Sequence, residues 1–84
     1  MIKVEQLMKK DLARVQSGNT AAAAAVVMQQ RAIGSVFVER CGEIVGIVTE
    51  SDIVRKVVGV NLLPEQILVE EIMSAPVIGI EDNR

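Results

Sequence analysis

The sequence contains no histidine and only one cysteine, Cys41, in 84 residues. Without histidine the commonest general base is missing, together with Ser–His and Cys–His nucleophile pairs and imidazole–metal sites. A lone cysteine cannot form an internal disulfide or a cysteine-based metal site. The phosphate-binding patterns G-x-x-x-x-G-K-[ST] and G-x-G-x-x-G are also absent. We therefore predict that the protein is not an enzyme and uses neither a metal nor a catalytic cofactor.

Aromatic residues, long apolar runs and basic runs are scarce as well. Phe37 is the only aromatic residue, so the core must be built from Val, Ile, Leu, Met and Ala. The net charge is −2 and no basic run is present, so the sequence does not predict the positively charged surface that is typical of nucleic-acid binding. The longest apolar run, residues 21–28, is far shorter than the ~20 residues of a membrane span. Charged residues interrupt the N-terminal region, so no signal-peptide pattern is present. We expect one small, soluble, cytoplasmic domain.

Turn residues divide the first part of the chain into an extended segment and a helix. Residues 12–15 are predicted to be extended, and residues 17–19 (Ser-Gly-Asn) break that segment and offer N-cap chemistry. Residues 20–30 predict a helix, because the run of alanines has high helix propensity and small side chains that let a helix lie close to a sheet.

A hairpin and a second helix are predicted next. Residues 35–39 are β-branched and aromatic, which favours a strand. The turn at residues 40–43 contains Gly42 where a positive φ is expected, so the strand that begins at Ile44 should pair back on the first. A helix is predicted over residues 51–58, with Gly59 as its C-cap. Pro64 then starts a short helical turn.

The chain is organised around the junction where the strand ends and this second helix begins. Residues 49–52 (Thr-Glu-Ser-Asp) form its polar part. Such junctions collect unpaired backbone N–H groups and the positive end of a helix dipole, which suit phosphates and sugar hydroxyls. The T-x-x-D spacing of Thr49 and Asp52 is also a capping-box pattern, with Thr49 as N-cap and Asp52 reaching back. The spacing alone favours the cap.

The sequence repeats itself at an offset of 65 positions. Residues 69–73 (VEEIM) match residues 4–8 (VEQLM), and the apolar pattern continues beyond the match. We interpret this as a duplication. Residues 1–63 are then the first repeat, and residues 64–84 are a connector and the beginning of a second repeat that stops where its long helix should begin.

These segments resemble a CBS domain (cystathionine β-synthase domain). The pieces that carry the resemblance are, in order, V-E-Q-L-M, M-Q-Q-R, I-G-S-V-F-V, C-G-E and G-I-V-T-E-S-D-I-V-R-K. The last piece is similar to the family pattern G-h-x-[ST]-x-x-[DN], filled here by Gly46, Ile47, Thr49 and Asp52. Val36 departs from the family, which often has proline there. The occurrence of all these pieces in the family's order favours a ligand-binding ancestry over the interpretation of Thr49 and Asp52 as a helix cap alone.

The resemblance implies an α+β fold: a β-α-β-β-α unit with a small three-stranded sheet and two helices on one face. Such units pair sheet to sheet (a Bateman module) and bind AMP, ADP, ATP or S-adenosylmethionine between the repeats. Thr49 would then donate its hydroxyl, and Asp52 would accept from the ribose diol in a charge-assisted contact. The other residues implied in the nucleotide site are Ile47, Ala13, Ile33, Gly34, Met73 and Ile78.

Two basic residues follow Asp52 on the same helix. Arg55 is a weaker candidate, for phosphate contact, because it lies on the same helical face as Asp52. Surface pairing of Arg55 with Asp52 or Glu50 is the interpretation we prefer. Lys56 is interpreted as solvated, and Cys41 as an incidental thiol in an exposed turn.

Three functions fit the sequence. The first is a regulatory or sensory protein that binds an adenine nucleotide. The second is a dimerisation or interaction module with a vacant cleft, and the third is a fragment of a larger enzyme or transporter regulated through its CBS region. One isolated repeat leaves an apolar sheet face uncovered, so we expect a homodimer or a missing C-terminal half.

Overall fold

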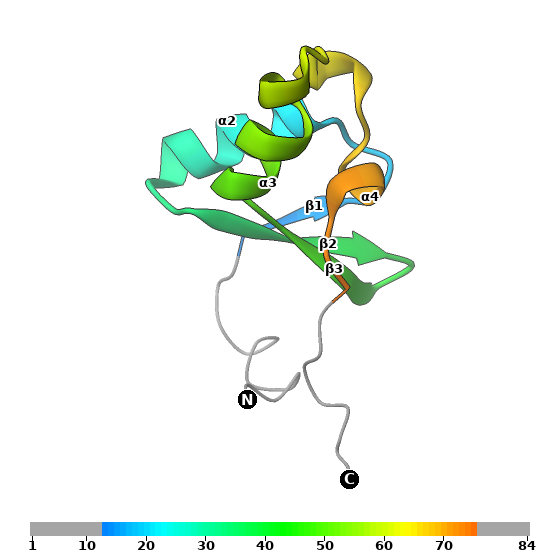
Figure 1. Ribbon diagram of the computed structural model, residues 1–84. Helices are drawn as coiled ribbons and strands as arrows, with labels where there is room; N and C mark the ends of the chain where they lie inside the picture. Colours follow the sequence, from blue (N-terminus) through cyan, green and yellow to red (C-terminus); the bar gives the residue numbers. More distant parts are fainter. Residues whose placement is uncertain (1–12, 76–84) are drawn as a thin grey trace, which may run out of the picture.

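The computed structural model describes residues 13–75, so residues 4–8 of the first repeat and the part of the second repeat after residue 75 lie outside it. The elements in chain order are β1 (Arg14–Gln16), α2 (Ala21–Arg31), β2 (Ser35–Arg40), β3 (Glu43–Thr49), α3 (Glu50–Lys56), the 3₁₀ turns Val58–Val60 and Pro64–Gln66, and α4 (Val69–Ile72). The described helices lie on one face of a three-stranded sheet (Figure 1). The predicted α+β fold is confirmed, and the domain boundaries stay a prediction.

Strand β2 occupies the centre of the sheet. β1 runs parallel to β2, with Arg14 opposite Phe37, and β3 runs antiparallel, with Ile47 opposite Phe37. The hairpin turn places Cys41 at φ 53° and Gly42 at φ 82°. These are the two positive φ values of a type I′ turn, which matches the twist of the strands. The predicted hairpin and the exposed position of Cys41 are confirmed. The starts of β1 and β2 and the end of β3 therefore lie at the same end of the sheet.

Helix α2 has a defined cap at each end. The Ala23 N–H donates to the hydroxyl of Thr20 at 3.1 Å, so Thr20 is the N-cap. The prediction that residues 17–19 supply the cap is wrong, because Thr20 itself takes the extended conformation from which a hydroxyl reaches the first turn. Ala32 ends the helix in the left-handed region at φ 54°. Ala21 and Ala24 are fully buried, so the small side chains bring α2 against the sheet as predicted.

Helix α3 ends earlier than predicted, at Lys56, and the chain continues into the 3₁₀ turn Val58–Val60. The left-handed residue is Asn61, at φ 66°, so the prediction of Gly59 as the C-cap is wrong. Asn tolerates this conformation because its short polar side chain can bond locally. Gly59 is needed for a close approach instead: a Cβ there would lie 2.6 Å from the carbonyl oxygen of Val54.

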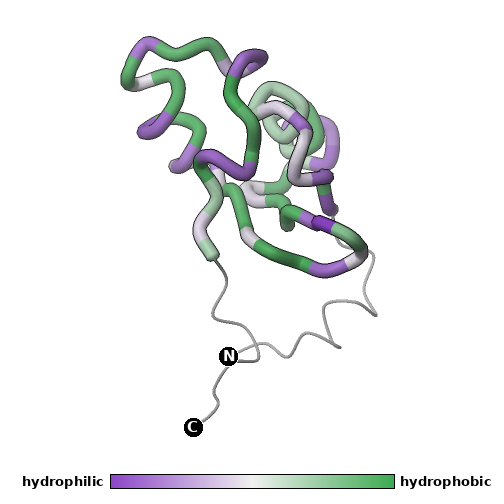
Figure 2. The backbone as a smooth tube through the Cα atoms, turned by 90° about the vertical axis from the view of Figure 1, so that its right-hand side faces the viewer, coloured by the Kyte–Doolittle hydropathy of each residue, from purple (hydrophilic) through white to green (hydrophobic). Residues whose placement is uncertain are grey.

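The core lies between the sheet and the helices. Val36, Val38 and Val48 point toward the helices and are at most 1% exposed. Phe37 and Ile47 alternate with them on the strands, so they lie on the opposite face, where both are partly exposed. Hydrophobic stretches run through both the sheet and the helical layer (Figure 2). Within residues 13–75 no second layer covers the face that carries Phe37 and Ile47.

The segment after the connector docks back on the first repeat. Helix α4 has four residues, too few to be stable alone. Its position is fixed by burial of Val69, which is 0% exposed, and of Ile72, which is 4% exposed. Directly after α4, Ser74 exchanges two backbone hydrogen bonds with Ile47, of 2.9 and 3.0 Å. The segment that matches residues 4–8 is thus held against the edge of β3.

Candidate functional site

Thr49 and Asp52 form a capping box at the start of α3. The Thr49 N–H donates to Oδ2 of Asp52 at 2.9 Å, and the Asp52 N–H donates to Oγ1 of Thr49 at 3.2 Å. The Thr49 hydroxyl also donates to Oδ2 of Asp52, at 3.2 Å. The helix-cap interpretation of the T-x-x-D spacing is confirmed. A capping role does not exclude ligand binding, because the carboxylate has a second oxygen.

That second oxygen belongs to an ion pair. Nζ of Lys56 lies 3.1 Å from Oδ1 of Asp52, and the same ammonium donates to the backbone carbonyl of Ile72 at 2.9 Å. The prediction that Lys56 is only solvated is wrong, and Asp52 pairs with Lys56 instead of Arg55. The i, i+4 spacing is the sequence signal that identifies this pair. Arg55 is exposed, and no ion pair or hydrogen bond joins it to another described residue.

Three donors therefore face the Asp52 carboxylate, whose side chain is 13% exposed. Burial by itself raises the pKa of this carboxyl. The hydrogen bonds from Thr49 and the bond and charge of Lys56 outweigh it and hold the pKa below its usual value of 3.8. Asp52 is thus ionised at neutral pH. A carboxylate offers about four lone-pair positions, so about one remains for a ligand.

The lowered pKa predicts that Asp52 stabilises the fold in a pH-dependent way. Because the folded-state pKa lies below the unfolded value, the stabilisation is present above the unfolded pKa and is lost as the pH falls through the folded pKa. We expect Asp52→Asn to lower the free energy of unfolding by about 1 kcal/mol at neutral pH. The two proteins should converge as the pH falls through the folded-state pKa of Asp52.

Urea unfolding at neutral pH and in steps down to pH ~3 measures this difference. Glu50→Gln is the matched control, because Glu50 is the neighbouring exposed carboxylate and takes no part in the capping box. A free-energy difference between parent and Asp52→Asn that does not change with pH would contradict the prediction.

Other predicted site residues gather at the same end of the sheet as Thr49. Ala13 immediately precedes β1, and Ile33 and Gly34 immediately precede β2. The Glu50 N–H donates to the carbonyl of Gly34 at 3.0 Å, which ties the start of β2 to the start of α3. Ala13 is buried and Ile33 packs against the core, so these two side chains also serve the packing of the fold.

The remaining predicted residues are more dispersed. Ile47 lies on the open face of the sheet, where it is partly exposed. The side chain of Met73 fills the space above Gly46, where a Cβ would lie only 2.8 Å from Cγ of Met73. This places Met73 against the core, so its thioether is engaged in packing. Ile78 lies outside the described residues.

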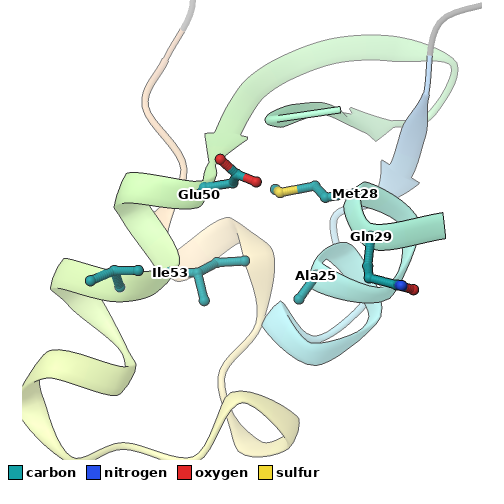
Figure 3. Close-up of a pocket in the computed structure, with 6 residues that line it drawn as sticks. Ala25, Met28, Gln29, Glu50 and Ile53 are labelled. Atoms are coloured by element: carbon teal, nitrogen blue, oxygen red, sulfur yellow. The ribbon is translucent and has the colours of Figure 1, made fainter. Parts of the chain in front are cut away.

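A pocket of about 450 Å³ lies between α2 and α3. Its lining residues are Ala25, Met28, Gln29, Glu50, Ile53 and Val54. Met28 and Glu50 point toward one another at one end of it (Figure 3). None of the predicted nucleotide-site residues lines this pocket. The pocket is nevertheless close to the site, because the Glu50 side chain also lies near Gly34.

The polar groups at the Thr49–Asp52 site are a hydroxyl, a carboxylate and an ammonium. These groups can form hydrogen bonds and electrostatic interactions with a polar ligand. Across residues 13–75, Cys, Asp and Glu side chains do not gather in groups of three that could hold a metal ion. No helix in that range is long and apolar enough to cross a membrane.

Fold and site together define a small α+β repeat with a T-x-x-D junction between its last strand and the helix that follows. A family model for the CBS domain matches residues 4–59. The chain therefore belongs to the CBS domain family, and the resemblance drawn from its sequence motifs is confirmed.

Three relatives show how far the similarity extends. An uncharacterized protein of Methanopyrus kandleri is 35% identical over 83 residues, which are 98% of this chain and 42% of that protein. The structure of a cystathionine β-synthase domain protein fused to a Zn-ribbon-like domain has a TM-score of 0.76 and 37% identity, covering 80% of this chain and 96% of that one. A proposed signal-transduction protein with CBS domains from Burkholderia ambifaria has a TM-score of 0.74 and 33% identity, covering 87% of this chain and 58% of that one. This chain thus spans less than half of the curated relative.

A further similar structure bears on assembly. The hexameric CBS-CP12 protein from bloom-forming cyanobacteria has a TM-score of 0.69 and 30% identity, covering 88% of this chain and 44% of that one. Proteins that contain CBS domains therefore include self-associating members.

Proposed function

We propose that this protein is a regulatory or sensory CBS domain protein, without catalysis of its own, that binds an adenosine-containing ligand through Thr49 and Asp52. The observation that carries the proposal is the Asp52 carboxylate in the first turn of α3, bonded to Thr49 at the end of β3, in the last position of the family pattern. An ionised carboxylate accepts strong, charge-assisted hydrogen bonds from a ribose diol. The ligand class is AMP, ADP, ATP or S-adenosylmethionine.

A ligand that binds at Asp52 meets a carboxylate that already has hydrogen-bond partners. Three acceptor positions of the carboxylate are already used by Thr49 and Lys56. A ligand hydroxyl therefore occupies the remaining position or displaces one of these donors, and its net affinity is the difference between the new and the old bonds. The apolar wall of the site comes from residues 73–78 or from another chain. A ligand that bridges two repeats favours one relative arrangement of them through differential affinity.

Isothermal titration calorimetry with AMP, ADP, ATP and S-adenosylmethionine tests the proposal. We expect at least one of the four to bind, and Asp52→Asn to weaken that binding about tenfold or more, because an amide replaces the charged acceptor. Asn keeps the size of the side chain and an acceptor oxygen for the Thr49 N–H. Far-UV circular dichroism shows whether α3 persists in the variant.

Glu50→Gln is again the matched control and should bind like the parent. If none of the four ligands binds, or if Asp52→Asn binds as tightly as the parent, the proposed nucleotide site is wrong.

Exposed apolar side chains favour a second function, self-association into a homodimer. Val26 on α2 is 51% exposed, Val54 on α3 is 59% exposed and Val58 just after α3 is 56% exposed. We call these three residues the helical patch. Of these three residues, Val54 also lines the pocket between α2 and α3. Single exposed apolar residues are ordinary, but several on one helical layer that also contains a pocket favour an interaction surface.

The open face of the sheet around Phe37 and Ile47 is a second surface that another repeat can cover. Cover by a second copy and cover by the C-terminal half of a longer chain are both compatible with this face. The interpretation of the chain as part of a larger CBS-regulated enzyme or transporter, and the cytoplasmic location, stay predictions.

A further inference from the structure

The segment that begins the second repeat is attached to the first repeat at both ends of α4. Before the helix, Leu68 forms an antiparallel bridge with Thr20. On its exposed side, Nη2 of Arg40 lies 3.1 Å from Oε1 of Glu70. At the C-terminal end of the helix, the backbone carbonyl of Ile72 accepts a hydrogen bond from Nζ of Lys56 at 2.9 Å. Only this last contact comes from α3, the helix that carries Asp52.

Lys56 makes its two contacts with one ammonium group. It holds Oδ1 of Asp52 at 3.1 Å and the carbonyl of Ile72 at 2.9 Å. The Ile72 carbonyl belongs to the last turn of α4, where carbonyl groups lack partners within the helix. The ammonium supplies that missing partner, while Asp52 balances its charge. The site carboxylate and the end of α4 are therefore joined through a single side chain.

The position of the Ile72 carbonyl fixes the residues that follow it. Met73 comes next and packs over Gly46. Ser74 then exchanges its two backbone hydrogen bonds with Ile47 on β3. The pairing with β3 thus begins two residues after the carbonyl that Lys56 holds. This stretch contains Met73, which is one of the predicted nucleotide-site residues.

We propose that Lys56 is a positioning residue of the candidate site: it links Asp52 to the end of α4 and thereby holds Met73 and Ser74 against β3. The Asp52 carboxylate and Met73 are then set relative to each other by one lysine. The link itself stands on geometry, and its effect on ligand affinity rests on the proposed nucleotide-binding function. A hydrogen-bonded ammonium provides this link, whereas a neutral side chain of similar length does not.

Amide hydrogen exchange of the full chain, followed by NMR, tests the link without a ligand. In Lys56→Met the amides of Ser74 and Ile47 should exchange about tenfold faster, because the charge-assisted bond that holds Ile72 is lost from a partly exposed site. The amides that pair β2 with β3 should change less than about twofold. Lys56→Arg keeps the charge and the donors, and it should restore slow exchange at Ser74.

Arg55→Met is the matched control, because Arg55 is the neighbouring exposed cation on α3 and has no described partner. It should leave both reporter amides unchanged. Unchanged exchange at Ser74 and Ile47 in Lys56→Met overturns the proposal. A uniform acceleration across the sheet also overturns it, because that result shows a general loss of stability and no local link.

Calorimetry with AMP then separates this proposal from the proposed function. If AMP binds the parent, Lys56→Met should bind it about tenfold more weakly and Lys56→Arg within about threefold of the parent. Equal or tighter binding by Lys56→Met overturns the positioning role. If neither AMP nor the other three ligands binds the parent, the proposed function fails, and hydrogen exchange still decides whether Lys56 holds the end of α4.

Discussion

Gly46→Ala is expected to lower the free energy of unfolding by about 1–3 kcal/mol, the usual cost of overpacking a core. A Cβ at residue 46 overlaps the sulfur of Met73 and lies 2.8 Å from its Cγ and 3.0 Å from its Cβ. The Met73 side chain must rotate to remove the contacts of its sulfur and Cγ, and it then loses its packing against the core. The remaining Cβ contact requires the Met73–Ser74 stretch to shift by a few tenths of an ångström, which weakens its pairing with Ile47.

Chemical denaturation of Gly46→Ala, Met73→Ala and the double variant measures this contact as a double-mutant cycle. The double variant should be more stable than the sum of the two single effects predicts, because Met73→Ala removes the sulfur and the Cγ that crowd the added methyl group. Gly18→Ala is the control, since no atom lies within 4 Å of a Cβ at that position. A Gly46→Ala protein as stable as the parent is incompatible with the position of Met73 over β3.

Residue composition and turn chemistry were sufficient to predict the sheet and the helix that covers it. Residues 35–39 predict a strand because they are β-branched and aromatic, whereas the burial of Val36 and Val38 and the outward position of Phe37 come from the structure. Gly42 predicts the hairpin because it readily takes a positive φ, and the second positive φ, at Cys41, is a finding of the structure. Five alanines predict a helix that lies close to the sheet. Each of these signals is local, so each can be read without knowledge of the fold.

The errors concern choices among neighbouring residues that compete for the same role. Gly59 is the obvious residue for a left-handed cap, but the chain places Asn61 there and uses Gly59 where the Val54 carbonyl approaches. Thr20 caps α2 in place of residues 17–19, because only the residue directly before the first turn has the required backbone geometry. Which of the neighbouring residues takes the cap position depends on the packing around it. That packing involves residues that lie far apart in the sequence.

The candidate site was predictable only in part for the same reason. Thr49 and Asp52 follow from a four-residue pattern, and their capping box has the expected hydrogen bonds. The role of Lys56 required knowledge that α4 returns beside α3, because Ile72 lies far along the chain from Lys56. The placement of Met73 over Gly46 likewise depends on that return. The repeat at residues 69–73 indicates a second copy, but it does not say that this copy docks on the first.

Val54→Asp is expected to dissociate a homodimer that forms through the helical patch. Val54 is 59% exposed in the single chain, and complete burial of a fully exposed valine side chain contributes about 1.5–3 kcal/mol. Covering the part of Val54 that is still exposed therefore contributes about 1–2 kcal/mol, and in a twofold dimer the residue is buried once on each copy. The substitution removes about 2–4 kcal/mol and adds the cost of burying two carboxylates. The dissociation constant should rise by a factor of about 100 or more.

Sedimentation velocity over a range of protein concentrations measures this constant for the parent and the variant. Val60→Asp is the matched control, because it places the same substitution at a valine that is 53% exposed and outside the helical patch. Phe37→Asp tests the opposite face of the molecule. If Phe37→Asp dissociates the dimer and Val54→Asp does not, the copies meet through their sheets, as the paired repeats of a Bateman module do. A parent that stays monomeric at all concentrations removes self-association through either face.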